Sequence, residues 1–227
     1  MQSRRLKNSL FYGYVLASRR VRRMPVVHVV GDSHVKAFRD SNPFITHHIH
    51  GATAHNLKMA CSRSRSSDQL RRVMNRIGRG DLLLMVFGEI DCRIHLYYQF
   101  RKDAGRRSMQ ELIERTVSNY GEVLAQLRGF GWNPCVYSVP PATDVGNQYS
   151  YPFYGTVDVR SRITRWFNRQ LEQFCKDRGF VFINVYPMVA GRDGLMLEEY
   201  ADDEIHLNRK VVRLVRREME RELGVRL

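Results

Sequence analysis

The sequence has few cysteines and lacks the motifs that mark several common classes of protein. Four cysteines occur among 227 residues, and they are widely spaced, without a Cys-x-x-Cys pair (Cys61, Cys92, Cys135 and Cys175). This spacing favours neither a zinc site nor a disulfide framework, and it predicts free thiols in a reducing, cytoplasmic compartment. Internal repeats, low-complexity tracts, a Walker loop and a Gly-x-Gly-x-x-Gly motif are also missing.

Acidic residues are missing from positions 1 to 23, which hold seven basic ones. The apolar run at 10–17 is too short to span a bilayer, and no cleavage site of a secretory signal follows it. We predict that residues 1–24 form a basic segment, a helix packed on the edge of a single domain at 25–227. An organellar transit peptide and weak contact with an anionic membrane or glycan stay open as alternatives.

The composition is that of one globular domain with an excess of positive charge. Hydrophobic residues make up 43% of the chain and charged residues 26%, with a net charge of +14. A positive net charge favours binding to anionic molecules or surfaces, but it does not indicate the fold. The arginine-rich stretch 62–80 has no interleaved aromatic residues, so we expect no specific nucleic-acid partner.

The chain is organised around residues 25–38, PVVHVVGDSHVKAF. The β-branched run before Gly31 predicts a buried parallel strand, and a helix is expected to begin near Val35. Ser33 would then lie at a strand-to-helix corner, where open α/β sheets place their chemistry. The alternative interpretation makes Asp32 or Ser33 an ordinary helix N-cap.

A second motif, Asp203-x-x-His206, lies near the other end of the chain. On a helical turn this spacing would place both side chains on one face. The carboxylate could then hold one ring nitrogen and leave the other within hydrogen-bond reach of Ser33, which needs a base to become a nucleophile. Six acidic residues between positions 193 and 204 would raise the proton affinity of His206.

Gly-Asp-Ser after the first strand, together with Asp-x-x-His before a C-terminal helix, resembles the GDSL or SGNH hydrolase family. Five apolar runs alternate with helical stretches, which predicts a flavodoxin-like three-layer α/β/α sandwich with a five-stranded parallel sheet. The resemblance implies an esterase or deacylase that often acts on acylated carbohydrate. It also implies an acyl-serine intermediate, no cofactor, and Ser33, Asp203 and His206 as the catalytic residues.

The resemblance extends to two further blocks that would stabilise an oxyanion. Gly51 follows the second strand, as does the family glycine whose amide lies in the oxyanion hole. The third block departs from Gly-x-Asn-Asp, because Ile90 replaces the asparagine donor. The loss of one such donor can cost about 2.7–4 kcal/mol. The remaining residues that we place at the substrate side of the site are Asp32, Glu89, Asp91 and Arg93.

Arg93 is our choice for the missing donor, and His95 is the next candidate along the chain. An ion pair with Glu89 or Asp91 that holds the loop is an equally weighted alternative for Arg93.

Two other groups of residues are candidates for a functional role. His47, His48 and His50 cluster in sequence, but strand alternation separates 47 from the other two, so we expect no metal site. The long segment 142–155 would form a lid or specificity wall. Its aromatic side chains could stack on sugars or simply pack the loop (Tyr149, Tyr151, Phe153 and Tyr154).

The sequence therefore predicts hydrolysis of an O-acyl ester, in the simplest case an acetyl ester, on a small molecule or glycan. Two alternatives stay open. An O-acyltransferase would use the same three residues and exclude water. A non-catalytic domain that binds an anionic glycan or nucleic acid would explain Ile90.

Overall fold

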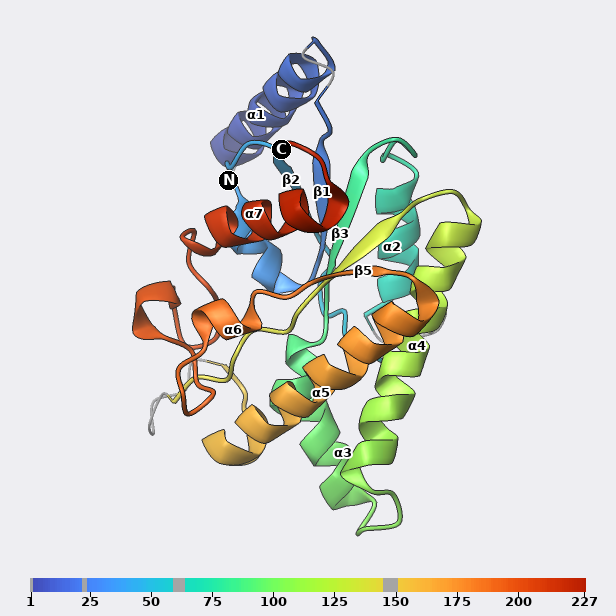
Figure 1. Ribbon diagram of the computed structural model, residues 1–227, viewed down its shortest axis with the longest axis vertical. Coiled ribbons are helices and arrows are strands. Elements are labelled where there is room, and N and C mark those ends of the chain that lie inside the picture. Colours follow the sequence, from blue (N-terminus) through green and yellow to red (C-terminus); the bar gives the residue numbers. More distant parts are fainter. Residues whose placement is uncertain (1, 22–23, 59–63, 145–150) are drawn as a thin grey trace.

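The structure is a computed structural model that describes residues 2–21, 24–58, 64–144 and 151–227. Its centre is a five-stranded sheet in the order β2-β1-β3-β4-β5, and all neighbouring strands are parallel (Figure 1). This is the flavodoxin-like order, so the predicted fold class is confirmed. The strands are β1 (Val27–Gly31), β2 (Phe44–His48), β3 (Leu82–Val86), β4 (Pro134–Tyr137) and β5 (Val181–Ile183).

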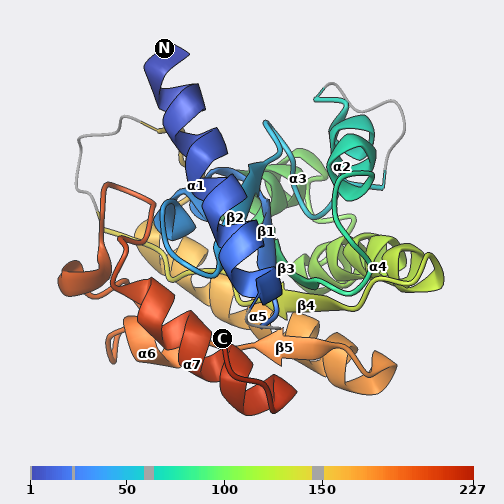
Figure 2. The same cartoon turned by 90° about the horizontal axis from the view of Figure 1, so that it is seen from above.

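Helices cover both faces of the sheet, with α2 and α4 on one side and α6 and α7 on the other (Figure 2). The first face is covered by α2 (Ser66–Met74), α3 (Leu96–Lys102), α4 (Met109–Gly129) and α5 (Val157–Arg178). The second is covered by the 3₁₀ helix η1 (Ser33–Phe38), α6 (Tyr186–Val189) and α7 (Val211–Leu223). A short 3₁₀ turn, η3 (Glu198–Tyr200), precedes α7. Burial of both faces explains why the central strands are continuous apolar runs.

The N-terminal segment forms α1 (Gln2–Val21), which projects from the sheet near β2 (Figure 2). Val15 is fully buried in a small apolar cluster with Val26 and Ile45. In the part of the chain that the structure describes, no helix has both the length and the apolar composition needed to cross a bilayer. Three cysteines are buried and free (Cys92, Cys135 and Cys175), whereas Cys61 lies outside the described residues.

The end of β1 is shaped by close contact with β3. A Cβ atom on Gly31 would lie 2.1 Å from the Val86 carbonyl oxygen, so only glycine fits there. The strand β1 therefore ends at Gly31, and the chain leaves the sheet there. Asp32 and Ser33 are the next two residues. The expected corner between strand and helix is present, although the helix is a 3₁₀ helix rather than an α-helix.

A helical stretch after β3 was not predicted from the sequence. A π-helical segment, η2 (Asp91–His95), leads directly into α3. A helical signal was nevertheless present, because Cys92, Leu96 and Phe100 recur every four residues and pack against one core cluster. This stretch matters for the site because it carries Asp91 and Arg93.

Candidate active site

Three side chains from opposite ends of the chain meet at the carboxyl edge of the sheet. Ser33 is the first residue of η1, immediately after β1 and its cap, and it is half-buried. Its Oγ lies 2.8 Å from Nε2 of His206, and the other ring nitrogen, Nδ1, lies 2.7 Å from Oδ2 of Asp203. These are the contacts that the two motifs predict, and the geometry allows the imidazole to accept the hydroxyl proton.

Asp203 and His206 lie on a tight turn, not on the helical turn that their spacing suggested. Oδ1 of Asp203 accepts hydrogen bonds from the N–H groups of Ile205 (2.9 Å) and His206 (2.8 Å). A bridge between Ala201 and Leu207 closes the turn on both sides. An aspartate that accepts hydrogen bonds from the N–H groups two and three residues ahead brings residues i and i+3 as close together as a helix does. The spacing alone therefore could not distinguish a turn from a helix.

The charges around His206 differ from the expectation based on its acidic neighbours. Burial lowers the pKa of His206, and the positive charge of His34 lowers it further, which outweighs the nearby Asp203 carboxylate. For Asp203, burial opposes ionisation, but the hydrogen bonds from Ile205 and His206 lower its pKa to about 2. The prediction of a raised proton affinity for His206 was therefore wrong, because sequence-local acids count for less than burial. At neutral pH the pair is a neutral imidazole held by a carboxylate.

A buried charged cluster lies next to His206. The ring of His34 is 4.8 Å from the ring of His206, and its Nε2 lies 3.4 Å from Oε2 of Glu89. The other oxygen of Glu89 accepts a hydrogen bond of 2.6 Å from Nε of Arg93. All three members are buried, as is Asp32. Sequence reasoning offered the Glu89–Arg93 pair but missed His34, because only the direction of the His34 side chain reveals its contact with Glu89.

The cluster is charged, and its pKa values follow from its contacts. Burial alone would raise the pKa of Glu89, but contact with His34 and pairing with Arg93 lower it to about 2. Burial opposes the charged form of His34, yet Glu89 and Asp32 raise its pKa above the ordinary value. These contacts favour the protonated form of His34, whose ring lies beside that of His206.

Asp32 has the N-cap role that was one of its two interpretations. Its Oδ1 accepts a hydrogen bond of 2.9 Å from the N–H of His34, which caps η1. Burial raises the pKa of Asp32 to about 6. Asp32 thus orients the corner that carries Ser33.

Arg93 forms the ion pair with Glu89 that was its alternative interpretation. Its Nη1 also donates to the carbonyl oxygen of Pro152, and its guanidinium lies over the ring of Phe153, 5.6 Å from the centroid. Arg93 therefore ties η2 to the segment after residue 150. An oxyanion role would fall to its remaining nitrogen, Nη2.

Asp91 also holds a loop. Its carboxylate accepts hydrogen bonds from the N–H groups of Ala54 (2.6 Å) and His55 (3.3 Å). Burial raises its pKa to about 7 in spite of these bonds. Asp91 fixes the turn that follows Gly51, so it acts on the site through the backbone.

Two backbone N–H groups are available at the corner. Gly51 lies just beyond β2, whose last residue, His48, is in register with Gly31 of β1. Its φ of +65° is one that glycine adopts without strain. Within the described residues, the N–H groups of Gly51 and Ser33 have no hydrogen-bond partner. They are the candidate oxyanion donors, since Ile90 offers no polar side chain.

The described part of the segment 142–155 packs around the site. Tyr151 lies edge-on to His206 with ring centroids 5.6 Å apart, and its hydroxyl donates to Asp203 Oδ2 at 3.4 Å. Phe153 lies under Arg160 at 4.4 Å, and Tyr154 packs on Tyr97 at 5.7 Å. Phe153 and Tyr154 thus pack the loop, and Tyr151 borders the reacting groups. Tyr149 lies outside the described residues.

The histidines in and just after β1 and β2 lie in two pairs. Nδ1 of His28 lies 2.9 Å from Nε2 of His47, whereas the His48 ring lies tilted against that of His50 with centroids 4.0 Å apart. This division agrees with strand alternation. In the described ranges no group of three or more potential ligands is arranged to hold a metal ion.

The fold and the arrangement at the sheet edge define a class. The chain has the fold of the SGNH or GDSL hydrolases, with a five-stranded parallel sheet and a serine at the end of its first strand. No protein-family profile matches the sequence, and no curated protein matches it.

Three solved structures illustrate the likeness. A GDSL-like lipase from Bacteroides thetaiotaomicron aligns over 94% of this chain and 95% of its own, at 17% identity and a TM-score of 0.55. An acetyl xylan esterase from Geobacillus stearothermophilus aligns over 90% and 98%, at 13% identity and a TM-score of 0.51. An esterase from Pseudoalteromonas aligns over 88% and 97%, at 13% identity and a TM-score of 0.51. At such identities the likeness establishes the fold.

Proposed function

We propose that this protein is a serine ester hydrolase that removes an O-acyl group, in the simplest case acetyl, from a small-molecule or glycan alcohol. The observation that carries the proposal is the continuous hydrogen-bonded line from Ser33 through His206 to Asp203. A serine hydroxyl needs such a base to attack an acyl carbon, and the base needs a carboxylate to hold its tautomer.

The reaction proceeds in two halves. In the first, His206 Nε2 takes the Ser33 proton while Oγ attacks the ester carbon, and the N–H groups of Ser33 and Gly51 stabilise the oxyanion. The alcohol leaves with the proton from His206, and an acyl-serine remains. In the second half, water loses a proton to His206 and attacks the acyl group, which restores Ser33.

The comparison structures support the choice of ester. One is an acetyl xylan esterase, and another is an esterase inhibited by monoethylphosphonate, an agent with a tetrahedral phosphorus. These activities are those of the two relatives, and we extend the chemistry, not their substrates, to this chain. Tyr151 beside His206 would pack against the alcohol portion of a bound ester, since the face of an aromatic ring suits the apolar face of a sugar.

The proposed activity is tested with acetylated oligosaccharides and an activated acetyl ester, in the presence and absence of an alcohol acceptor. We expect release of free acetate at a rate that the acceptor does not increase, because Ser33 is only half-buried and Asp203 is exposed, so water can reach the acyl group. Transfer of acetyl to the acceptor as the main product would instead establish an acyltransferase. If the wild-type protein neither turns over esters nor reacts with a fluorophosphonate, a non-catalytic binding domain is the better description.

The His34 charge predicts a particular pH dependence. Because the pKa of His206 is below its ordinary value of about 6.5, kcat/KM should hold steady near that pH and fall only at more acidic pH. Replacement of His34 by glutamine removes a positive charge next to His206. The pKa of His206 should then rise, so the acid limb of the profile should move to higher pH.

The matched control is His95→Gln, which removes an exposed histidine and should leave the acid limb in place. The measurement is kcat/KM for an acetyl ester between mildly acidic and neutral pH. An acid limb that stays where it is in the His34→Gln variant, or moves to lower pH, would show that the His34 charge does not act on His206.

A further inference from the structure

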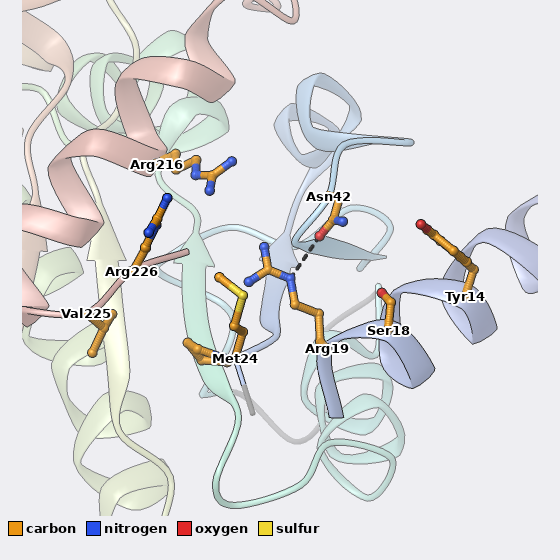
Figure 3. Close-up of a pocket in the computed structure, with 9 residues that line it drawn as sticks. Tyr14, Ser18, Arg19, Met24, Asn42, Arg216, Val225 and Arg226 are labelled. Carbon is orange, nitrogen blue, oxygen red and sulfur yellow. Dashed lines mark hydrogen bonds between the residues drawn. The ribbon is translucent and has the colours of Figure 1, made fainter. Parts of the chain in front are cut away.

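A second site lies at the opposite edge of the sheet from Ser33. A pocket of about 880 Å³ opens between α1, the residues that precede β1 and β2, and the C-terminal residues after α7 (Figure 3). Because strands run from this edge towards the carboxyl edge, the pocket is separated from the proposed active site by the length of β1. It is lined by Tyr14, Ser18, Arg19, Met24, Pro25, Asn42, Arg216, Val225 and Arg226.

The pocket is strongly cationic. Three of the lining side chains are arginines, and none of the described residues that line it is acidic. Arg19 is only 5% exposed, its Nε donates to Oδ1 of Asn42 at 3.0 Å, and its guanidinium points into the space between Asn42 and Arg226 (Figure 3). Planar guanidinium groups that converge on one space suit the oxygens of a phosphate group.

One carboxylate lies near the rim of the pocket. Oε1 of Glu220 is 3.4 Å from Nε of Arg216 and accepts a hydrogen bond of 2.8 Å from the N–H of Leu227. Glu220 therefore offsets part of the charge of Arg216 and Arg226, and it anchors the last residues next to the pocket. The three arginines that line the pocket outnumber this carboxylate.

The outer face of α1 shows where such a phosphate would come from. Leu10, Tyr14 and Val21 are 68%, 64% and 85% exposed, and Ala17 between them is exposed as well. At 3.6 residues per turn, the spacing of positions 10, 14, 17 and 21 places these side chains on one stripe of the helix. The buried Val15 faces the domain instead. The stripe is an apolar face that no described part of the chain covers.

An apolar stripe on a basic helix is the pattern of helices that lie in a membrane interface. Positions 1–23 hold seven basic residues and no acid, and the whole chain has a net charge of +14. Tyr14 belongs to both features, since it lies in the stripe and also lines the pocket. The stripe and the pocket are thus adjacent parts of one surface.

We propose that α1 and the arginine pocket form a docking surface for an anionic phospholipid membrane, with the lipid phosphate in the pocket and the apolar stripe in the interface. This inference is independent of the esterase proposal, because neither feature includes a residue of that site.

The test is co-sedimentation of the full chain with vesicles of phosphatidylcholine alone or of equal parts phosphatidylcholine and phosphatidylserine. We expect binding only to the anionic vesicles. Arg226→Ala should weaken that binding by roughly fivefold, the effect of one basic residue at an anionic surface. Arg217→Ala is the matched control, because it removes an exposed charge from α7 that does not line the pocket.

A double substitution, Leu10→Ser with Tyr14→Ser, tests the stripe without a change of charge. We expect it to reduce vesicle binding at least as much as Arg226→Ala, with an unchanged thermal transition because the replaced side chains are exposed. Equal losses for Arg226→Ala and Arg217→Ala would overturn the proposal in favour of general charge attraction. Saturable binding of inorganic phosphate in the pocket, with no vesicle binding by the wild type, would also overturn it.

Discussion

Replacement of Ser33 by alanine is expected to abolish ester turnover and leave the fold intact. The hydroxyl is the only nucleophilic atom that His206 Nε2 contacts among the described residues, at 2.8 Å. Loss of the nucleophile in a Ser-His-Asp site reduces kcat by at least about a thousandfold. The same change should remove labelling by a fluorophosphonate, which requires an activated serine.

The structural cost of Ser33→Ala should be small. Ser33 is half-buried and loses one hydrogen bond, a change of about 1 kcal/mol in the free energy of unfolding. Ser118→Ala, at an exposed position of α4, is the control and should retain both labelling and turnover. Labelling that persists in the Ser33→Ala protein would show that another residue is the nucleophile.

Arg93→Ala is expected to destabilise the protein strongly. The change removes one partner of a buried ion pair and leaves Glu89 with a charge that only His34 offsets. Such losses cost about 3–5 kcal/mol. It also removes the hydrogen bond to the Pro152 carbonyl and the Arg93 contact with the Phe153 ring, which leaves the ring in contact with Arg160. The measurement is denaturant unfolding followed by fluorescence or circular dichroism.

Two further variants make the result specific. Arg93→Lys keeps the charge but loses the planar donor geometry, so its stability should fall between those of wild type and Arg93→Ala. Arg101→Ala, at an exposed position of α3, should change stability by no more than about 0.5 kcal/mol. Single-turnover acylation by the same proteins then separates the two interpretations of Arg93. If Arg93→Ala is as stable as wild type yet acylates slowly, Arg93 is an oxyanion donor and not mainly a structural residue.

The order of elements follows from the sequence because hydrophobic pattern and length determine it. The residues before Gly31 and before Gly88 are apolar at almost every position. Only a strand that is buried on both faces of a sheet requires such a continuous apolar run. The bounds of α5 are also marked in the sequence, since Thr156 caps its start and Gly179 ends it. A sequence of this kind predicts a doubly covered parallel sheet without further information.

The pairing of Ser33 with Asp203 and His206 could also be predicted, although 173 positions separate Ser33 from His206. The carboxyl ends of parallel strands share one edge, so motifs that follow strands meet there. The shape of the turn that carries Asp203 could not be predicted, because an Asx-type turn and a helix give the same i, i+3 spacing.

The electrostatics of the site required the tertiary structure. Burial sets the pKa of His206 more than its sequence neighbours do, and burial depends on what covers the ring. The cluster of His34, Glu89 and Arg93 likewise depends on side-chain directions at the ends of two strands. The sequence suggested the Glu89–Arg93 pair, but the contact of His34 with Glu89 appears only in the structure.

The arginine pocket is the clearest example of a feature that the sequence does not predict. Its lining comes from positions 14–25, 42 and 216–226, which no local pattern connects. The basic, acid-free start of the chain could be read from the sequence, whereas the convergence of Arg19 with Arg216 and Arg226 on one cavity could not. The sequence by itself determined the layers, the strands and the three side chains of the proposed catalytic site, because these depend on periodicity and on the common edge of a parallel sheet. The tertiary structure decided which charges are buried together, because that depends on packing between distant segments.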